Sequence, residues 1–118
     1  MAKILITEDE IMIAMDLKLM LTERGHNVIG IAGEATEAFN LVLECKPDLI
    51  FMDINLRGKI DGIAIAQNIR KSSDVPIVFC SAYSSRKSID EALSIATTRF
   101  ITKPFSDNAI GYVLDKVL

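Results

Sequence analysis

The chain has 118 residues, half of them apolar, and a net charge of −3 from 16 acidic and 13 basic side chains. A chain of this length suits one domain with one hydrophobic core, so we expect a single domain over residues 1–118. The charges form no basic stripe, and no apolar run approaches the roughly 18 to 20 residues of a membrane span, so we expect a cytoplasmic protein that binds neither nucleic acid directly nor a membrane.

Five short, nearly continuous apolar runs alternate with segments of helical periodicity. The runs cover residues 3–7, 27–31, 48–52, 75–79 and 99–102. Such runs are typical of strands buried on both faces of a parallel sheet. Apolar residues spaced i, i+3, i+4, i+7 predict helices between and after them, around residues 10–24, 35–46, 61–71, 89–96 and 106–117.

Residues that begin and end helices agree with these limits. Gly25 suits the position after the first helix, and Pro47 stops the second. Asp61 and Ser106 are suitable N-caps for the third and fifth helices. The result is an α/β fold of five βα units, with right-handed crossovers and helices on both faces of a doubly wound parallel sheet.

Polar side chains follow four of the five strands, while the second strand ends in Ile31-Ala32-Gly33 and offers none. A strand order of 2-1-3-4-5 explains this asymmetry, because ligands bind at the carboxyl ends of strands beside the switch point, here between the first and third strands. The converging side chains are Glu8, Asp9, Asp53, Ser81 and Lys103.

Three carboxylates that converge in this way cannot all remain ionised without a cation between them. The pattern therefore predicts a divalent metal site around Asp53. Each residue also has a simpler interpretation. Glu8 and Asp9 suit a helix N-terminus, Ser81 suits a turn cap, and Lys103 suits a solvated surface.

The chain resembles the receiver domains of two-component response regulators, which are flavodoxin-like and include the chemotaxis regulators. The resemblance spans essentially the whole chain and rests on four segments in the family's order and spacing. They are Ile4-Leu5-Ile6-Thr7-Glu8-Asp9-Glu10, Met52-Asp53-Ile54-Asn55-Leu56 followed by Asp61-Gly62, Cys80-Ser81-Ala82, and Thr102-Lys103-Pro104-Phe105.

The resemblance implies that Asp53 accepts a phosphoryl group from a phosphohistidine on a sensor histidine kinase or phosphotransfer protein. It implies Mg²⁺, or Mn²⁺, bound by Asp9, Asp53 and the backbone carbonyl of Asn55, with Glu8 acting largely through metal-bound water. Such a metal bridges two groups of like charge and neutralises charge that develops during transfer.

The resemblance also implies that Ser81 and Lys103 contact phosphoryl oxygens, and that a cis peptide precedes Pro104. Movement of Ser81 and Phe100 would switch the surface of the fourth helix, fifth strand and fifth helix for an output protein or domain. The family members catalyse only their own aspartyl phosphorylation and dephosphorylation, so we expect no turnover enzyme. Whether phosphorylation produces a homodimer stays open.

The loop after Asp53 departs from the usual pattern, because it lacks a proline after Leu56 and is one residue longer. Its Arg57 and Lys59 either steer a phosphorylated partner or are simply solvated. Asn55 and Tyr83 occupy positions that, in the family, tune loss of the phosphoryl group.

Three other functions fit the sequence less well. A haloacid-dehalogenase-type hydrolase would need an acid two residues after the nucleophile, where this chain has Asn55. A flavodoxin-type module would need a phosphate-binding loop after the first strand, where acidic residues repel phosphate. A module that works without phosphorylation is disfavoured because no pocket residue is missing. Cys45 and Cys80 are interpreted as small buried hydrophobic residues.

Overall fold

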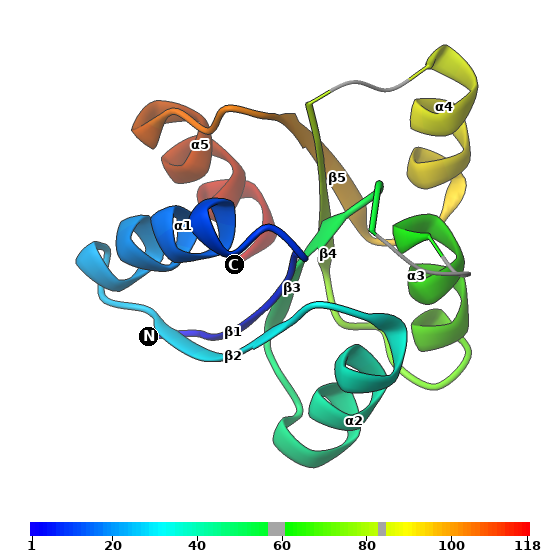
Figure 1. The fold of residues 1–118 in the computed structure, drawn as a ribbon, viewed down its shortest axis with the longest axis horizontal. Helices are drawn as coiled ribbons and strands as arrows, with labels where there is room; N and C mark the ends of the chain where they lie inside the picture. Colours follow the sequence, from blue (N-terminus) through cyan, green and yellow to red (C-terminus); the bar gives the residue numbers. More distant parts are fainter. Residues whose placement is uncertain (57–60, 83–84) are drawn as a thin grey trace.

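The structure, a computed structural model, describes residues 1–56, 61–82 and 85–118. Strands and helices alternate along the chain, as predicted (Figure 1). The strands are β1 (Lys3–Thr7), β2 (Asn27–Ala32), β3 (Leu49–Asp53), β4 (Ile77–Ser81) and β5 (Thr98–Thr102). The helices are α1 (Ile11–Glu23), α2 (Ala35–Cys45), α3 (Gly62–Arg70), α4 (Arg86–Ser94) and α5 (Asp107–Val117).

The strands form one sheet in the order β2-β1-β3-β4-β5, and every neighbouring pair is parallel. The predicted order is therefore confirmed. Helices α1 and α5 cover one face, and α2, α3 and α4 cover the other (Figure 1). Among the described residues no helix has the length and apolar character needed to span a membrane.

Each central strand contributes to two hydrophobic layers, because successive side chains point to opposite faces. In β1, Ile4 and Ile6 pack with α1 and α5, whereas Leu5 packs with the helices of the other face. In β3, Phe51 and Met52 divide between the two layers in the same way. The apolar runs are continuous because neither face of these strands meets water.

The largest differences from the predicted boundaries are at β4 and α4, and the other boundaries agree to within one residue. Strand β4 begins at Ile77 rather than at residue 75, after Pro76, which has no N–H to donate to a strand ladder. Helix α4 covers Arg86–Ser94, so it begins before the apolar pattern that starts at Ile89 and ends before the last residue of that pattern, Ala96. The Ser85 side chain caps its start by accepting from the Ser88 N–H at 3.1 Å, and extended backbone at Ile95 ends it.

Other residues that were predicted to begin or end helices do so in the structure. Asp61 and Ser106 cap α3 and α5 by accepting N–H groups three residues onward, at 2.9 and 3.0 Å. Gly25 follows α1 with a φ of 86°, in the left-handed region that glycine tolerates. These residues therefore set where the first helix ends and where the third and fifth helices begin.

Candidate functional site

Polar side chains from four strands meet at the carboxyl edge of the sheet. Asp53 and Ser81 are the last residues of β3 and β4, and Glu8 and Lys103 directly follow β1 and β5. Although all four are polar, Glu8 and Asp53 are only 5% exposed and Ser81 is 1% exposed. The sheet order brings them together, since β1 lies beside β3 and β4 lies beside β5.

Backbone hydrogen bonds extend the sheet past its regular strands and hold these residues in position. The Glu8 N–H donates to the Ala32 carbonyl at 2.8 Å, and the Lys103 N–H donates to the Ser81 carbonyl at 3.0 Å. The Lys103–Pro104 peptide is cis, as the resemblance implied. Each functional side chain is therefore attached to backbone that the sheet itself orders.

Lys103 places one ammonium group between two buried carboxylates. Its Nζ donates to Glu8 Oε1 and lies 3.3 Å from Asp53 Oδ2. Burial alone would lower the pKa of Lys103, but the hydrogen bond and negative charge of Glu8, together with Asp53, outweigh burial and raise that pKa. Lys103 is therefore firmly cationic.

The pKa of Glu8 shows that the one ammonium group of Lys103 does not balance the negative charge of the carboxylate cluster. Burial raises the pKa of Glu8 to about 7, with a further contribution from Asp53, against the opposing effect of the hydrogen bond from Lys103. In the absence of another cation, the cluster therefore takes up a proton near neutral pH.

The arrangement of the carboxylates suits a divalent cation. Glu8, Asp9 and Asp53 each offer one oxygen, and these oxygens lie within 4.8 Å of one another. Ligand atoms around an octahedral Mg²⁺ with bonds of about 2.1 Å are about 3 to 4 Å apart, so small side-chain adjustments would close the set. Hard carboxylate oxygens are the ligands that Mg²⁺ prefers.

Asn55 connects Asp53 to Ser81. The Asn55 backbone N–H donates to Asp53 Oδ1 at 3.1 Å, and its side-chain Nδ2 donates to Ser81 Oγ at 2.8 Å. Sequence reasoning assigned Asn55 a backbone role and a part in phosphoryl loss, and it missed this side-chain bond. No local pattern could have revealed it, because Asn55 and Ser81 are 26 positions apart.

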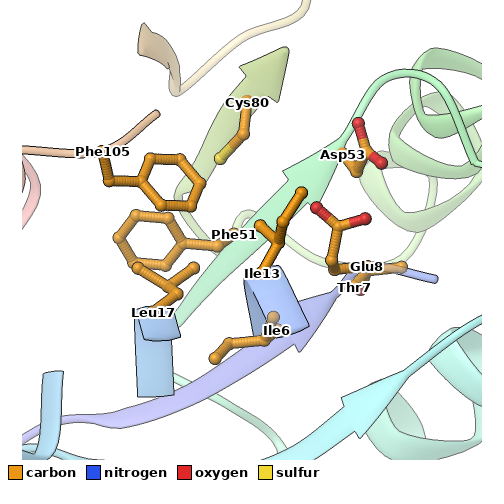
Figure 2. A pocket seen from close by; sticks show the side chains of 9 residues that line it. All are labelled: Ile6, Thr7, Glu8, Ile13, Leu17, Phe51, Asp53, Cys80 and Phe105. Carbon is orange, nitrogen blue, oxygen red and sulfur yellow. The ribbon is translucent and has the colours of Figure 1, made fainter. Parts of the chain in front are cut away.

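The floor of the site is apolar. Glu8 and Asp53 line one end of a small cavity whose other lining side chains include Phe51, Phe105 and Leu17 (Figure 2). The cavity has a volume of about 10 Å³, roughly the least that holds one water molecule. Because so little water fits beneath the carboxylates, charge interactions at the floor are weakly screened.

Gly62 is a second residue whose importance sequence reasoning missed, although the motif that carried the resemblance includes it. A Cβ on Gly62 would lie 2.0 Å from the Asp53 carbonyl oxygen and 2.8 Å from the Asp53 carbonyl carbon. The Gly62 N–H donates to the Ile54 carbonyl at 3.0 Å. The start of α3 thus packs directly on the backbone that carries Asp53.

The structure brings together all five side chains that the sequence placed at strand ends: Glu8, Asp9, Asp53, Ser81 and Lys103. Phe100 is partly buried and packs on the α2, α3 and α4 side of the sheet. Arg57, Lys59 and Tyr83, to which the sequence assigned roles near the pocket, lie outside the described residues.

Comparison with known protein families identifies one family over most of the chain. The model of the response regulator receiver domain matches residues 4–115. Transcriptional regulatory protein PdtaR from Mycobacterium tuberculosis is 39% identical over 104 residues, covering 88% of this chain and 50% of the relative. Chemotaxis protein CheY from Thermotoga maritima is 33% identical over 98% of this chain and 96% of its own length.

A further relative and a solved structure agree. Phyllosphere-induced regulator PhyR from Methylorubrum extorquens is 38% identical over 98% of this chain and 43% of the relative. The crystal structure of a two-component response regulator from Clostridium difficile superposes with a TM-score of 0.91 at 27% identity, over 99% of this chain and 95% of that one. The chain spans half or less of the length of the PdtaR and PhyR relatives.

Proposed function

Because the chain belongs to the response regulator receiver domain family, whose members act in phosphorylation-based signalling, we propose that it is a phosphorylation-driven switch with Asp53 as phosphoacceptor. We take its 118 residues as one receiver domain of the cytoplasm. The observation that carries the proposal is the environment of Asp53. Its carboxylate is 5% exposed, lies 3.3 Å from the Lys103 ammonium, and shares a cluster with two other carboxylates.

The reaction is transfer of a phosphoryl group from a phosphohistidine to Asp53. A bond forms between an Asp53 carboxylate oxygen and phosphorus, and the phosphorus–nitrogen bond breaks, with the electron pair left on the imidazole. Little covalent chemistry falls to the protein, so its task is positioning and charge stabilisation. Asp53 is held for this task by the Asn55 N–H on one oxygen and by Lys103 beside the other.

Asp9, Asp53 and the Asn55 carbonyl would hold Mg²⁺ or Mn²⁺ directly, and Glu8 would act through metal-bound water. A bound ion would neutralise negative charge on the carboxylates and on the incoming phosphoryl group. Lys103 then exchanges part of its contact with the carboxylates for a phosphoryl oxygen, as a compact charge on a flexible chain can do. Ser81 donates its hydroxyl to another phosphoryl oxygen.

The phosphodonor is a sensor histidine kinase or a phosphotransfer protein, and an apolar groove beside the site offers it a place to dock. The groove has a volume of about 880 Å³ and is lined by Met12, Met15 and Leu19 of α1, and by Lys103 and Phe105. These three α1 side chains are about half exposed or more. Because Lys103 forms part of the wall, a helix in the groove would lie directly beside the acceptor.

The output surface is formed by α4, β5 and α5, where a partner protein or domain would sense the phosphorylated state through Ser81 and Phe100. Arg86 of α4 and Tyr112 of α5 are exposed there, and Lys116 lies over the Tyr112 ring at 5.3 Å. The chain acts as a switch and modifies only itself, with no turnover of external substrates.

The direct test is phosphorylation by acetyl phosphate with Mg²⁺, followed by intact-mass measurement. We expect a gain of one phosphoryl group that is stable in acid, labile in base and absent in EDTA. Asp53→Asn should abolish it, whereas Asp74→Asn, the same change at an exposed position, should leave it intact. A wild-type chain that accepts no phosphoryl group from acetyl phosphate or from any phosphorylated kinase would refute the function.

The docking groove has a separate test. Met15→Glu places a charge in the groove and should slow transfer from a phosphorylated kinase domain, while the rate with acetyl phosphate stays unchanged. Equal slowing with both donors would mean that the change damages the site rather than the docking surface.

A further inference from the structure

The Ser81 hydroxyl already has a specific partner in the structure, and that partner is Asn55. Asn55 Nδ2 donates to Ser81 Oγ at 2.8 Å. Asn55 is exposed whereas Ser81 is 1% exposed, so the bond joins a surface side chain to a buried hydroxyl. Within the described part of the chain, no hydrogen bond joins Ser81 Oγ to the Asp53 carboxylate.

The bond to Asn55 fixes the position of the Ser81 hydroxyl. A serine hydroxyl has one proton to donate and two lone pairs that accept. Toward Asn55 the hydroxyl accepts, so its proton stays available for a phosphoryl oxygen, which can only accept. Because Ser81 Oγ makes no hydrogen bond to the Asp53 carboxylate within the described residues, Oγ has to move away from the position that Asn55 holds to reach a phosphoryl group on Asp53.

Asn55 is itself attached to the phosphoacceptor. Its backbone N–H donates to Asp53 Oδ1 at 3.1 Å, two residues back along the chain. A hydrogen bond to an ionised carboxylate is roughly twice as strong as one to a neutral acceptor. Phosphorylation converts the carboxylate into an acyl phosphate, so the acyl oxygens lose their charge and this bond weakens. The same chemical event thus loosens the turn that places the Asn55 side chain on Ser81.

From these contacts we propose that the Asn55 carboxamide is a latch that holds the Ser81 hydroxyl in its resting position and must release it for Ser81 to bind the phosphoryl group. Asn55 is in this respect a positioning residue, acting through Ser81. The inference rests on the proposed function and specifies the regulation of the same site. It predicts that the side chain of Asn55 opposes the phosphorylated state, although its backbone serves that state.

The affinity for beryllium trifluoride, a mimic of the phosphoryl group, measures how far the Asn55 side chain disfavours the phosphorylated state. This measurement involves no chemical step. Binding to the full chain with Mg²⁺ is followed by fluorine-19 NMR. Asn55→Ala keeps the backbone N–H and carbonyl and removes only the carboxamide. Since a neutral hydrogen bond is worth about 0.5–1.5 kcal/mol, Asn55→Ala should bind the mimic about 2- to 10-fold more tightly.

Two controls isolate the latch. Asn68→Ala makes the same change in α3 at an exposed residue whose Nδ2 donates to the Ala64 carbonyl of its own helix at 3.3 Å, and it should leave affinity unchanged. In a Ser81→Ala background, Asn55→Ala should no longer tighten binding, because the latch has nothing to hold. Weaker or unchanged binding by Asn55→Ala, or the same gain in both backgrounds, overturns the proposal.

A measurement on the resting protein separates the latch from the proposed function. In nitrogen-15 spectra without ligand, Ser81→Ala should shift the side-chain amide resonances of Asn55 and not those of Asn68. Unshifted Asn55 resonances overturn the latch alone. Failure of the wild type both to bind the mimic and to react with acetyl phosphate overturns the proposed function, and the role of the latch with it.

Discussion

Gly62 is the position at which the smallest change should most disturb the site. A Cβ on Gly62 would lie 2.0 Å from the Asp53 carbonyl oxygen, a backbone atom that cannot rotate away. Contacts of a real Cβ stay above 3.0 Å, so Gly62→Ala forces α3 and the end of β3 apart by about 1 Å. Overpacking of this kind costs about 1–3 kcal/mol, and we expect a loss at the upper end because both sides are backbone.

Urea unfolding followed by far-ultraviolet circular dichroism measures this loss, since the chain has no tryptophan. The same loss should lower the melting temperature by about 8–12 °C, because for a domain of this size each kcal/mol corresponds to about 4 °C. A displacement of 1 Å at a reacting group can cost about 100-fold in rate, and acetyl phosphate should therefore phosphorylate Gly62→Ala far more slowly.

Gly111→Ala is the matched control. Its Cβ would meet the Arg24 guanidinium at 2.7 Å, but that group ends a flexible, partly exposed side chain. Loss of its ion pair with Asp107 costs less than about 1 kcal/mol, which the better helix propensity of alanine offsets. If Gly62→Ala matched Gly111→Ala in both stability and phosphorylation rate, the packing argument at Asp53 would be wrong.

Three other predictions concern polar groups that are buried or partly buried. Burial, with Asp53, raises the pKa of Glu8 from 4.5 to about 7, so the folded state retains a proton that the unfolded state releases. In EDTA the free energy of unfolding should therefore fall by up to about 3 kcal/mol as pH rises from 4.5 to 7, and Glu8→Gln should remove this decline. Arg70 donates to carbonyls of the α3–β4 and α4–β5 loops at 2.7 to 3.0 Å, so Arg70→Met should lower the free energy of unfolding by about 2–4 kcal/mol. Arg86→Met, at an exposed position, should change it by less than about 0.5 kcal/mol, and an equal loss would contradict this view of Arg70. Burial raises the pKa of the Cys80 thiol, so at pH 8 a thiol reagent should modify Cys45 alone until urea exposes both, and rapid modification of both in the native protein would refute that assignment.

The acidic cluster explains why stability and function oppose each other at this site. Glu8 and Asp53 are buried beside a single ammonium group, and only a cation or a proton relieves their repulsion. A core of apolar residues would be more stable in their place. The same imbalance would provide the affinity for the divalent ion that the proposed phosphoryl transfer to Asp53 requires.

Local sequence determined the elements and their order. Continuous apolar runs identified buried strands, and capping residues such as Asp61 and Ser106 located helix starts, because both signals depend on neighbours within a few residues. The boundaries of β4 and α4 were predicted less well. At α4 the apolar period extends beyond the turn at which extended backbone ends the helix.

The site, too, was predictable from the sequence only in part. Polar residues after strands, together with the strand order, were enough to predict that Glu8, Asp53, Ser81 and Lys103 converge, since parallel strands end at one edge. Only the tertiary structure decided which atoms meet there. Lys103 pairs with Glu8 across 95 positions, and the side chain of Asn55 holds Ser81 across 26. Such contacts depend on how helices and sheet pack, and side-chain direction over those separations is not encoded in any local pattern.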